Sequence, residues 1–484
     1  ADAKLTFPSW FETVMTEAGY LKWLLEQDGK IFLIMVINSV FAEIKKLVAH
    51  NHRFKLADLL RSLELIREHH LRITIQDLAV RRQAVHLSTV HKAKGREWDF
   101  VFLTQVIDKK WGNSRVRELI KLPASILPNT DLSKKERNED ERRLFYVALT
   151  RAKKQVFISS PAALLTDGHS RDSVPSMFVT EMAELDPKEK LIGRMEHPHI
   201  KSKADEYLLK LLRPNQPLII ENTQKTYFRW LLDHFRWSVT ALNNYLKDPE
   251  KFIQQNLLRV PRAKALPFAF GTAIHAALES YYTNLQGTGQ LPTLNSLQQS
   301  FQQALSQEIL TESEFKERLK YGKDILEQYH QHYQHNPPQS LMIERFFGIG
   351  RQKVVLDNIL LTGRIDRIDW LDKAKKLVKV VDYKTGQPKS SNQIEGKVGK
   401  LSEREQVLPE SIRGSYKRQL LFYKLLTQLD RTFPHEVVYG EFDFIQPNAS
   451  GKLVRRGFEL EDQAVEDLKK LIKETIDELN TRWQ

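Results

Sequence analysis

The sequence contains no cysteine among its 484 residues. Disulfides, thiolate-bound zinc and iron–sulfur clusters all require cysteine, so the sequence excludes them and is typical of a cytoplasmic protein. Long apolar runs are also missing. The longest uncharged one, "IFLIMVI" at 31–37, is about a third of the roughly 20 residues that a membrane-spanning helix needs. We therefore expect no iron–sulfur cluster and no membrane association.

Two further features are missing from the chain. No GxxxxGK[ST] loop, which would cradle nucleotide phosphates, occurs anywhere in it. No basic segment followed by an apolar one opens the sequence, so we expect no signal peptide. The first residue is alanine rather than methionine, which indicates a part of a longer protein.

Positive charge is abundant. The net charge of +13 and the sequence pI of about 9.4 predict attraction to polyanions, of which nucleic acid is the commonest. A basic enzyme with another substrate is the alternative. Because 484 residues exceed what one hydrophobic core usually supports, we expect two or three domains.

The pattern of apolar residues divides the chain into four parts. Residues 1–83 have helical periodicity. Residues 84–165 carry short apolar strands, at 84–90, 100–106 and 156–160, with a helix before the last, which predicts part of a parallel α/β sheet. Residues 166–236 contain two proline-bearing stretches and are predicted to be a tail and linker. Residues 237–484 return to helices and strands, and predict a second α/β domain.

The stretch "LLTGRIDRIDWLDKAKKLVKVVDYKTG" predicts a β-hairpin whose strands carry Asp366 and Asp382. Facing residues of antiparallel strands lie about 5 Å apart, close enough for two carboxylates to share a hard cation. Lys384 shares a face with Asp382, where its ammonium can orient an attacking water and offset phosphate charge. A solvated surface ion pair is the alternative for Asp382 and Lys384.

Three other stretches of this domain carry polar residues in apolar surroundings. "GTAIH" places His275 one helical turn after Gly271, where the missing side chain permits a close approach. "MIERFF" places Glu344 on a strand. "QLLFY" places Gln419 and Tyr423 on one helical face, able to hold a phosphate or an adjacent side chain. Each is also compatible with an ordinary structural role.

Taken together and in order, these stretches resemble the GxxxH, E, GxxD, DxK and QxxxY motifs of the RecB-like PD-(D/E)XK nucleases. The resemblance implies a restriction-endonuclease-like α/β fold over 237–484 and Mg²⁺ as cofactor, with Mn²⁺ as a possible substitute. It implies that His275, Asp366 and Asp382 hold the metal, with a contribution from Glu344. It also implies that Lys384, Gln419 and Tyr423 are catalytic. Asp369 is a rival ligand. Asp248 stands where many AddB-like relatives have a cluster-binding cysteine.

In the first half, "STVHKAKGREWDFVFL" and "DERRLFYVALTRAKK" resemble motifs V and VI of the UvrD/Rep superfamily of DNA helicases. By this resemblance Arg151 contacts the γ-phosphate of ATP, Gly95 and Glu97 border the nucleotide, and His91 links to the DNA path. A turn at the carboxyl end of a strand over 84–90 suits such contacts. The alternative is a connecting loop with solvated lysines.

The two resemblances predict a partial RecA-like sheet with a helical N-terminal region that resembles a helicase insertion, followed by the nuclease domain. ATP is expected to act only in the full-length protein, because the phosphate loop is missing. DNA, and a missing N-terminal motor domain or partner subunit, are the expected partners. The alternatives are an inactive platform that binds DNA or another subunit, and a nuclease unrelated to any motor. The intact Asp366, Asp382 and Lys384 argue against the first, and the motif VI helix against the second.

Overall fold

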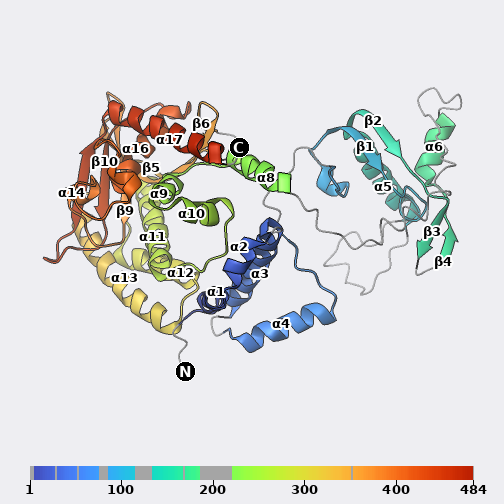
Figure 1. Cartoon of the computed structure of the whole chain (residues 1–484), viewed down its shortest axis with the longest axis horizontal. Helices are drawn as coiled ribbons and strands as arrows, with labels where there is room; N and C mark the ends of the chain where they lie inside the picture. The colour runs from blue at the N-terminus through green and yellow to red at the C-terminus, as the bar shows by residue number, and fades with distance from the viewer. Residues whose placement is uncertain are drawn as a thin grey trace. The chain divides into compact units, whose positions relative to one another are not determined.

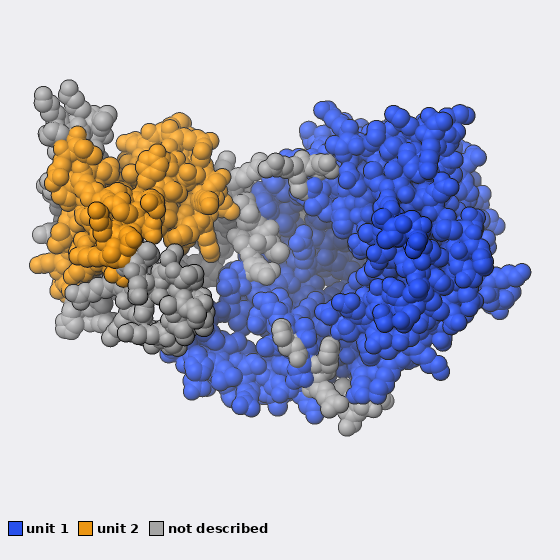
Figure 2. Space-filling model, turned by 180° about the vertical axis from the view of Figure 1, so that it is seen from behind, with its two compact units in different colours: residues 1–80, 215–484 blue, residues 81–214 orange. Residues whose placement is uncertain are grey.

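The computed structural model describes residues 5–27, 30–51, 54–75, 85–114, 133–166, 169–185, 221–349 and 353–482. The chain forms two compact units, residues 1–80 together with 215–484, and residues 81–214 (Figure 2). Part of the predicted tail and linker, 186–220, lies outside the described residues. Among the described residues, no helix is both long enough and apolar enough to cross a membrane.

The smaller unit is built around two parallel strands. β1 (Trp98–Leu103) pairs with β2 (Ala152–Ile158), and α5 (Lys134–Leu149) packs on one face of the pair. The other elements are η1 (His91–Ala93), the hairpin of β3 (Ala163–Thr166) and β4 (His169–Asp172), and α6 (Met177–Leu185). The parallel pair and its helix confirm the expected partial parallel α/β sheet.

One strand of this sheet was predicted but does not form. The sequence predicts it over 84–90, whereas residues 85–90 form no strand. Val85 and Leu87 are 88% and 96% exposed, and no strand of the described part pairs with this segment. An alternating pattern gives a stable strand only where a partner accepts its hydrogen bonds. The turn at 91–95 therefore precedes β1 and does not follow a strand.

Four helices open the larger unit: α1 (Phe7–Glu17), α2 (Tyr20–Glu26), α3 (Lys30–His50) and α4 (Leu56–Glu68). Two hydrogen bonds connect them to the loop before α11 (Leu266–Thr288). The Glu12 carboxylate accepts one from the Ala263 N–H at 2.7 Å, and Lys45 Nζ donates one to the Arg262 carbonyl at 3.1 Å. Most of the described residues up to 70 are helical, as the sequence predicts, whereas residues 71–75 form no helix.

A five-stranded sheet forms the centre of the larger unit, in the order β11-β10-β9-β8-β5. Its strands are β5 (Ser340–Phe347), β8 (Gly363–Asp372), β9 (Leu377–Lys384), β10 (Glu436–Phe444) and β11 (Val454–Glu459). β9 and β10 are parallel, and the other neighbours are antiparallel. The β8–β9 hairpin is the one that the sequence predicts, whereas β11 was not predicted.

Helices cover both faces of this sheet (Figure 1). α11, α12 (Leu294–Ser306) and α13 (Glu312–Tyr333) share a hydrophobic core with Val381 of β9. α16 (Ser415–Leu429) and α17 (Asp462–Arg482) share another core with Val380. Successive residues of a strand point to opposite faces, so these two neighbours enter different cores. Side chains of β8 and β9 are therefore held from both sides.

Shorter elements complete the unit. Trp237 joins the chain entering the unit to the β6–β7 hairpin, because its N–H donates to the Leu360 carbonyl and its carbonyl accepts from the Thr362 N–H, at 2.8 and 2.9 Å. These elements are α8 (Glu221–His234), α9 (Val239–Lys247), α10 (Pro249–Phe252), the π-helical turn η3 (Ile253–Leu257), β6 (Val354–Leu356), β7 (Ile359–Leu361), α14 (Ser391–Ile394) and α15 (Glu403–Gln406).

Candidate active site

The β8–β9 hairpin brings two buried carboxylates together. Arg367 is paired with Val381, and the same register continued by one residue sets Asp366 opposite Asp382. The Asp366 carboxylate accepts a hydrogen bond from the Tyr383 N–H at 2.8 Å, which locks it to the neighbouring strand. Only 4% of Asp366 and 3% of Asp382 is exposed. The sequence-based placement of the two aspartates on facing strands agrees with this geometry.

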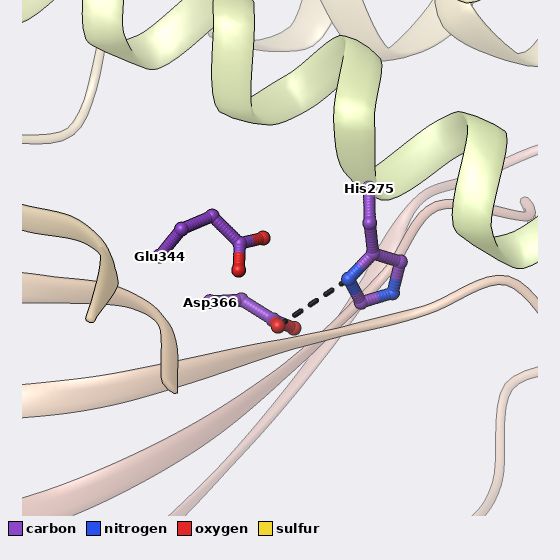
Figure 3. Close-up of side chains that lie close together, drawn as sticks. All are labelled: His275, Glu344 and Asp366. Carbon is purple, nitrogen blue, oxygen red and sulfur yellow. Dashed lines mark ion pairs between the residues drawn. The ribbon is translucent and has the colours of Figure 1, made fainter. Parts of the chain in front are cut away.

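His275 and Glu344 converge on Asp366 from a helix and from a neighbouring strand (Figure 3). His275 lies on α11, with its Nδ1 3.3 Å from Asp366 Oδ1. Potential ligand atoms of His275, Glu344 and Asp366 all lie within 4.8 Å of one another, a spacing that a metal ion can bridge. Gly271, one turn before the histidine, meets the loop after β9, because a Cβ there would lie 3.2 Å from the Thr385 hydroxyl.

Glu344 has an unusual backbone and environment. Its φ of 48° is left-handed, which is uncommon for any residue other than glycine and is concentrated at functional sites. Its carboxylate lies 2.8 Å from Arg364 Nε, an ion pair that the sequence did not indicate. Burial, reinforced by the Asp366 charge, raises the pKa of the Glu344 carboxyl to about 7. This group therefore exchanges its proton near neutral pH.

The other buried aspartate, Asp382, is held by α16. Its Oδ1 accepts hydrogen bonds from Gln419 Nε2 and from the Tyr423 hydroxyl, each at 2.7 Å. Its Oδ2 lies 2.8 Å from Lys384 Nζ, and that ammonium also donates to Gln419 Oε1 at 2.7 Å. Of the two roles left open for the QxxxY pair, the structure shows the contact with an adjacent side chain.

The charges of the site shift one another's pKa values. Burial favours the neutral form of the Asp366 carboxyl, but the His275 ring and the Tyr383 N–H outweigh this and lower its pKa. Burial and the Asp366 charge raise the pKa of Asp382 in spite of Lys384. Burial lowers the pKa of Lys384, yet Asp382 more than compensates and raises it, so the ammonium stays charged. The His275 pKa is likewise raised, because the carboxylates outweigh burial.

Several buried atoms of this cluster suit a cation. Within the described residues, Glu344 Oε1 has neither a hydrogen-bond nor an ion-pair partner, and His275 Nδ1, Glu344 Oε2 and Asp382 Oδ2 contact only their ion-pair partners Asp366, Arg364 and Lys384. Buried polar atoms are normally satisfied, so such a cluster calls for an explanation such as an ion. Carboxylate oxygens are ligands that Mg²⁺ prefers, and a set that adds one imidazole nitrogen also suits Mn²⁺. The residues present therefore fit a divalent metal.

Asp369, the rival ligand, has a different partner. Both of its carboxylate oxygens accept hydrogen bonds from Arg367 Nε, at 2.9 and 3.1 Å. Asp366 and Asp369 are three residues apart on β8, so strand alternation places them on opposite faces. That alternation was the signal in the sequence that separates the two aspartates. Arg367 itself is buried and was not singled out from the sequence.

The residues singled out in the first half meet in the smaller unit. The Arg151 guanidinium donates to the Val147 and Arg96 carbonyls at 3.1 and 3.3 Å, which sets it beside the turn that contains Gly95 and Glu97. Gly95 has a φ of +79°, a conformation that glycine adopts without strain. His91 lies in η1 ahead of this turn. The cluster forms from residues more than fifty positions apart.

Comparisons with known proteins match two successive parts of the chain. Residues 236–483 match the PD-(D/E)XK nuclease superfamily, and residues 8–162 match the UvrD-like helicase C-terminal domain. The first match covers every residue of the cluster around Asp366 and Asp382. The second covers the Arg151 cluster and also the four N-terminal helices.

The chain is also similar to curated helicases. It is 26% identical over 212 residues to the ATP-dependent DNA helicase Rep of Buchnera aphidicola subsp. Baizongia pistaciae, which covers 41% of this chain and 29% of that protein. It is 31% identical over 111 residues to the ATP-dependent DNA helicase PcrA of Staphylococcus epidermidis, covering 22% and 13%. The chain thus spans less than a third of the length of these relatives. It belongs to the PD-(D/E)XK nuclease superfamily, with a UvrD-like helicase C-terminal domain fused before the nuclease domain.

Proposed function

We propose that this chain hydrolyses phosphodiester bonds of DNA with a divalent metal ion, Mg²⁺ or Mn²⁺. The observation that carries the proposal is the convergence of potential ligand atoms of His275, Glu344 and Asp366 within 4.8 Å, beside the buried Asp382–Lys384 pair. Three of these residues are acidic, and without a cation their charges repel. The match to the nuclease superfamily supports the assignment of this cluster to nucleic-acid cleavage.

The side chains divide the work of hydrolysis among them. His275, Glu344, Asp366 and Asp382 would hold the metal, which lowers the pKa of a bound water and offsets charge on the attacked phosphate. Lys384, kept charged by Asp382, is placed to orient the attacking water and to stabilise negative charge that develops on phosphate oxygens. Gln419 and Tyr423 act through Asp382, because both donate hydrogen bonds to its Oδ1 and fix the carboxylate.

We further propose that the chain works as the C-terminal part of a cytoplasmic helicase–nuclease in repair or recombination of double-strand breaks. The similarity to DNA helicases of which the chain matches only 29% and 13% supports a motor domain outside this chain, which would bind ATP together with Arg151, Gly95 and Glu97. The exposed face of the β1–β2 sheet fits such a partner. Phe100 and Phe102 are 51% and 66% exposed there, and the ring of Phe102 stacks on that of Phe157 with ring centres 4.6 Å apart.

Cleavage of end-labelled DNA tests the proposed nuclease activity. Single- and double-stranded substrates are incubated with the chain and Mg²⁺, Mn²⁺ or EDTA, without ATP. We expect cleavage with either metal and none with EDTA. The Asp366→Asn variant should lose both the cleavage and the rise in melting temperature that Mn²⁺ binding gives the unsubstituted chain.

The contrary result is equally specific. DNA binding that weakens with salt, without cleavage in any metal by the unsubstituted chain, would contradict the nuclease proposal and favour the inactive platform. An unchanged melting temperature with millimolar Mn²⁺ would contradict the metal site itself. ATP hydrolysis by this chain alone would contradict the proposed need for a separate motor domain.

Metal binding should tighten as the pH rises. The pKa of Glu344 is raised to about 7, so the carboxyl is mostly protonated at pH 6 and mostly ionised at pH 8. A ligand must lose its proton to bind a metal, so the Mn²⁺ dissociation constant should fall about tenfold over this range. The raised pKa of His275 acts in the same direction. Calorimetric titration at pH 6, 7 and 8 measures the change.

The Glu344→Gln variant is the control for this pH dependence. It removes the titrating carboxyl and keeps the size of the side chain, so its affinity for Mn²⁺ should be weaker at pH 8 and should vary less between pH 6 and 8. A dissociation constant of the unsubstituted chain that stays constant over this range would show that Glu344 is not a ligand.

A further inference from the structure

A second lysine lies next to Lys384 and has no role in the site described above. Lys389 follows β9 by five residues, and its Nζ lies 4.0 Å from the centre of the Tyr416 ring. Lys384 Nζ lies 4.5 Å from the same ring centre. The two ammonium groups are therefore within about 8.5 Å of each other, the sum of these distances. One aromatic ring thus holds two positive charges beside the buried aspartates.

The position of Lys389 is fixed by the backbone around it. Ser390 begins α14 with a capping box in which its hydroxyl and the Gln393 side chain each bind the other's backbone N–H. The end of α14 lies directly against the start of α16, because a Cβ on Gly414 would overlap the Ile394 carbonyl oxygen, at 1.9 Å. The loop that carries Lys389 is therefore held against the first turn of α16.

The ring between the two lysines is also held in place. Tyr416 lies in the first turn of α16 and packs on Phe442 of β10, with ring centres 5.1 Å apart. Lys384 lies over both rings, at 4.5 Å and 5.1 Å. An ammonium over an aromatic face is stabilised by the ring, so Tyr416 orients Lys389 toward the same region as Lys384.

The two lysines differ in their partners. Lys384 is engaged by Asp382 and Gln419. Lys389 forms no ion pair with any carboxylate in the described part of the chain, and it lies close to another positive charge. Two neighbouring cations repel, and an anion between or beside them relieves the repulsion. The arrangement therefore provides a free positive charge next to the residues that would hold the attacked phosphate.

We propose that Lys389 binds the DNA phosphate adjacent to the one that is cleaved, with Tyr416 as the support that orients its ammonium. This inference rests on the proposed nuclease function. A strand that places one phosphate at the metal and Lys384 must place a neighbouring phosphate nearby, and the ammonium of Lys389 is available to bind it. Its role is substrate binding, distinct from the chemistry assigned to Lys384.

Binding and cleavage measured separately test this role. Fluorescence anisotropy with a labelled single-stranded oligonucleotide in EDTA gives the dissociation constant at several salt concentrations, and cleavage with Mn²⁺ gives kcat and KM. Lys389→Gln should raise the dissociation constant and KM about three- to tenfold and should change kcat less. The slope of log Kd against log salt should fall by about one, as for the loss of one phosphate contact.

Three variants separate this effect from a general loss of charge or structure. Lys389→Arg keeps the charge and should restore most of the affinity. Tyr416→Leu removes the ring and should weaken DNA binding in the same direction as Lys389→Gln. Lys320→Gln on α13 removes one exposed lysine elsewhere and should leave KM and the salt slope unchanged. The melting temperature of each variant, measured alongside, identifies any variant that is poorly folded.

The outcomes distinguish this inference from the proposed function. If the unsubstituted chain cleaves DNA but Lys389→Gln keeps its KM and salt slope, the phosphate contact is overturned and the nuclease function stands. If Lys389→Gln lowers kcat with KM unchanged, a substrate-binding role is also overturned. If the unsubstituted chain neither binds nor cleaves DNA, the proposed function fails, and this inference fails with it.

Discussion

Lys384→Ala should lower the rate of DNA cleavage about 10²- to 10³-fold, while metal binding persists. The ammonium lies 2.8 Å from Asp382 Oδ2 and 2.7 Å from Gln419 Oε1, on the strand that carries the aspartate. Removal of one preorganised donor from a site where charge develops in the transition state typically costs this much in kcat. Single-turnover cleavage of end-labelled single-stranded DNA with Mn²⁺ measures the loss.

The controls for this variant separate chemistry from folding and from metal loss. Lys373→Ala removes an exposed lysine from the turn of the same hairpin and should cleave at the unsubstituted rate. Lys384→Ala should keep the rise in melting temperature that Mn²⁺ produces, because none of the proposed metal ligands is changed. A Lys384→Ala variant that cleaves within about tenfold of the unsubstituted chain would contradict the catalytic assignment of this lysine.

The candidate site was predictable from the sequence to the extent that it depends on local pattern. Asp366 and Asp382 belong to one hairpin with a short turn, so strand alternation and antiparallel pairing together place them face to face. Spacing on one helix likewise places Gln419 and Tyr423 on a common face, where both reach Asp382. Such relations extend over a few residues or one turn and can be read from the sequence without knowledge of the tertiary fold.

Relations between distant segments could not be read in this way. The ion pair of Glu344 with Arg364 depends on how β5 pairs with β8, and the left-handed backbone of Glu344 has no sequence signal. Residues 85–90 have the alternating pattern of a strand but no partner strand among the described residues, so the pattern alone predicted a strand that does not form. Lys389 was missed because its proximity to Lys384 depends on Tyr416, which another element supplies.

Arg367 is a buried charge that supports the two strands carrying Asp366 and Asp382. Its Nη1 donates a hydrogen bond to the Tyr383 hydroxyl at 2.9 Å, and Tyr383 stands between Asp382 and Lys384 in β9. Its Nε binds Asp369, and its guanidinium lies 4.0 Å from the buried Asp443 of β10. Burial lowers the pKa of Arg367, but Tyr383 and Asp369 outweigh this and raise it, so the charge is retained.

Asp443 depends on the same arginine and on two tyrosines of α13. Its Oδ2 accepts hydrogen bonds from the Tyr329 and Tyr333 hydroxyls, at 3.0 and 2.7 Å. Burial raises its pKa, and Arg367 opposes that shift. The network thus joins β8, β9, β10 and α13 through one guanidinium. Because every member is buried, loss of the Arg367 charge would leave Asp369 and Asp443 buried without the positive charge that offsets their desolvation.

Arg367→Leu should therefore destabilise the larger unit by about 3–5 kcal/mol, since removal of one partner of a buried ion pair leaves the other charges unpaired. Thermal unfolding of the full chain should show the corresponding transition about 10 °C lower. Arg404→Leu is the matched control, because it breaks a two-bond contact with Glu478 at the surface and should cost about 1 kcal/mol or less. Arg367→Leu combined with Asp369→Leu should recover part of the loss, because the double variant no longer buries that unpaired carboxylate. If Arg367→Leu and Arg404→Leu lowered the stability equally, or if the double variant recovered no stability, Arg367 would not act through its charge.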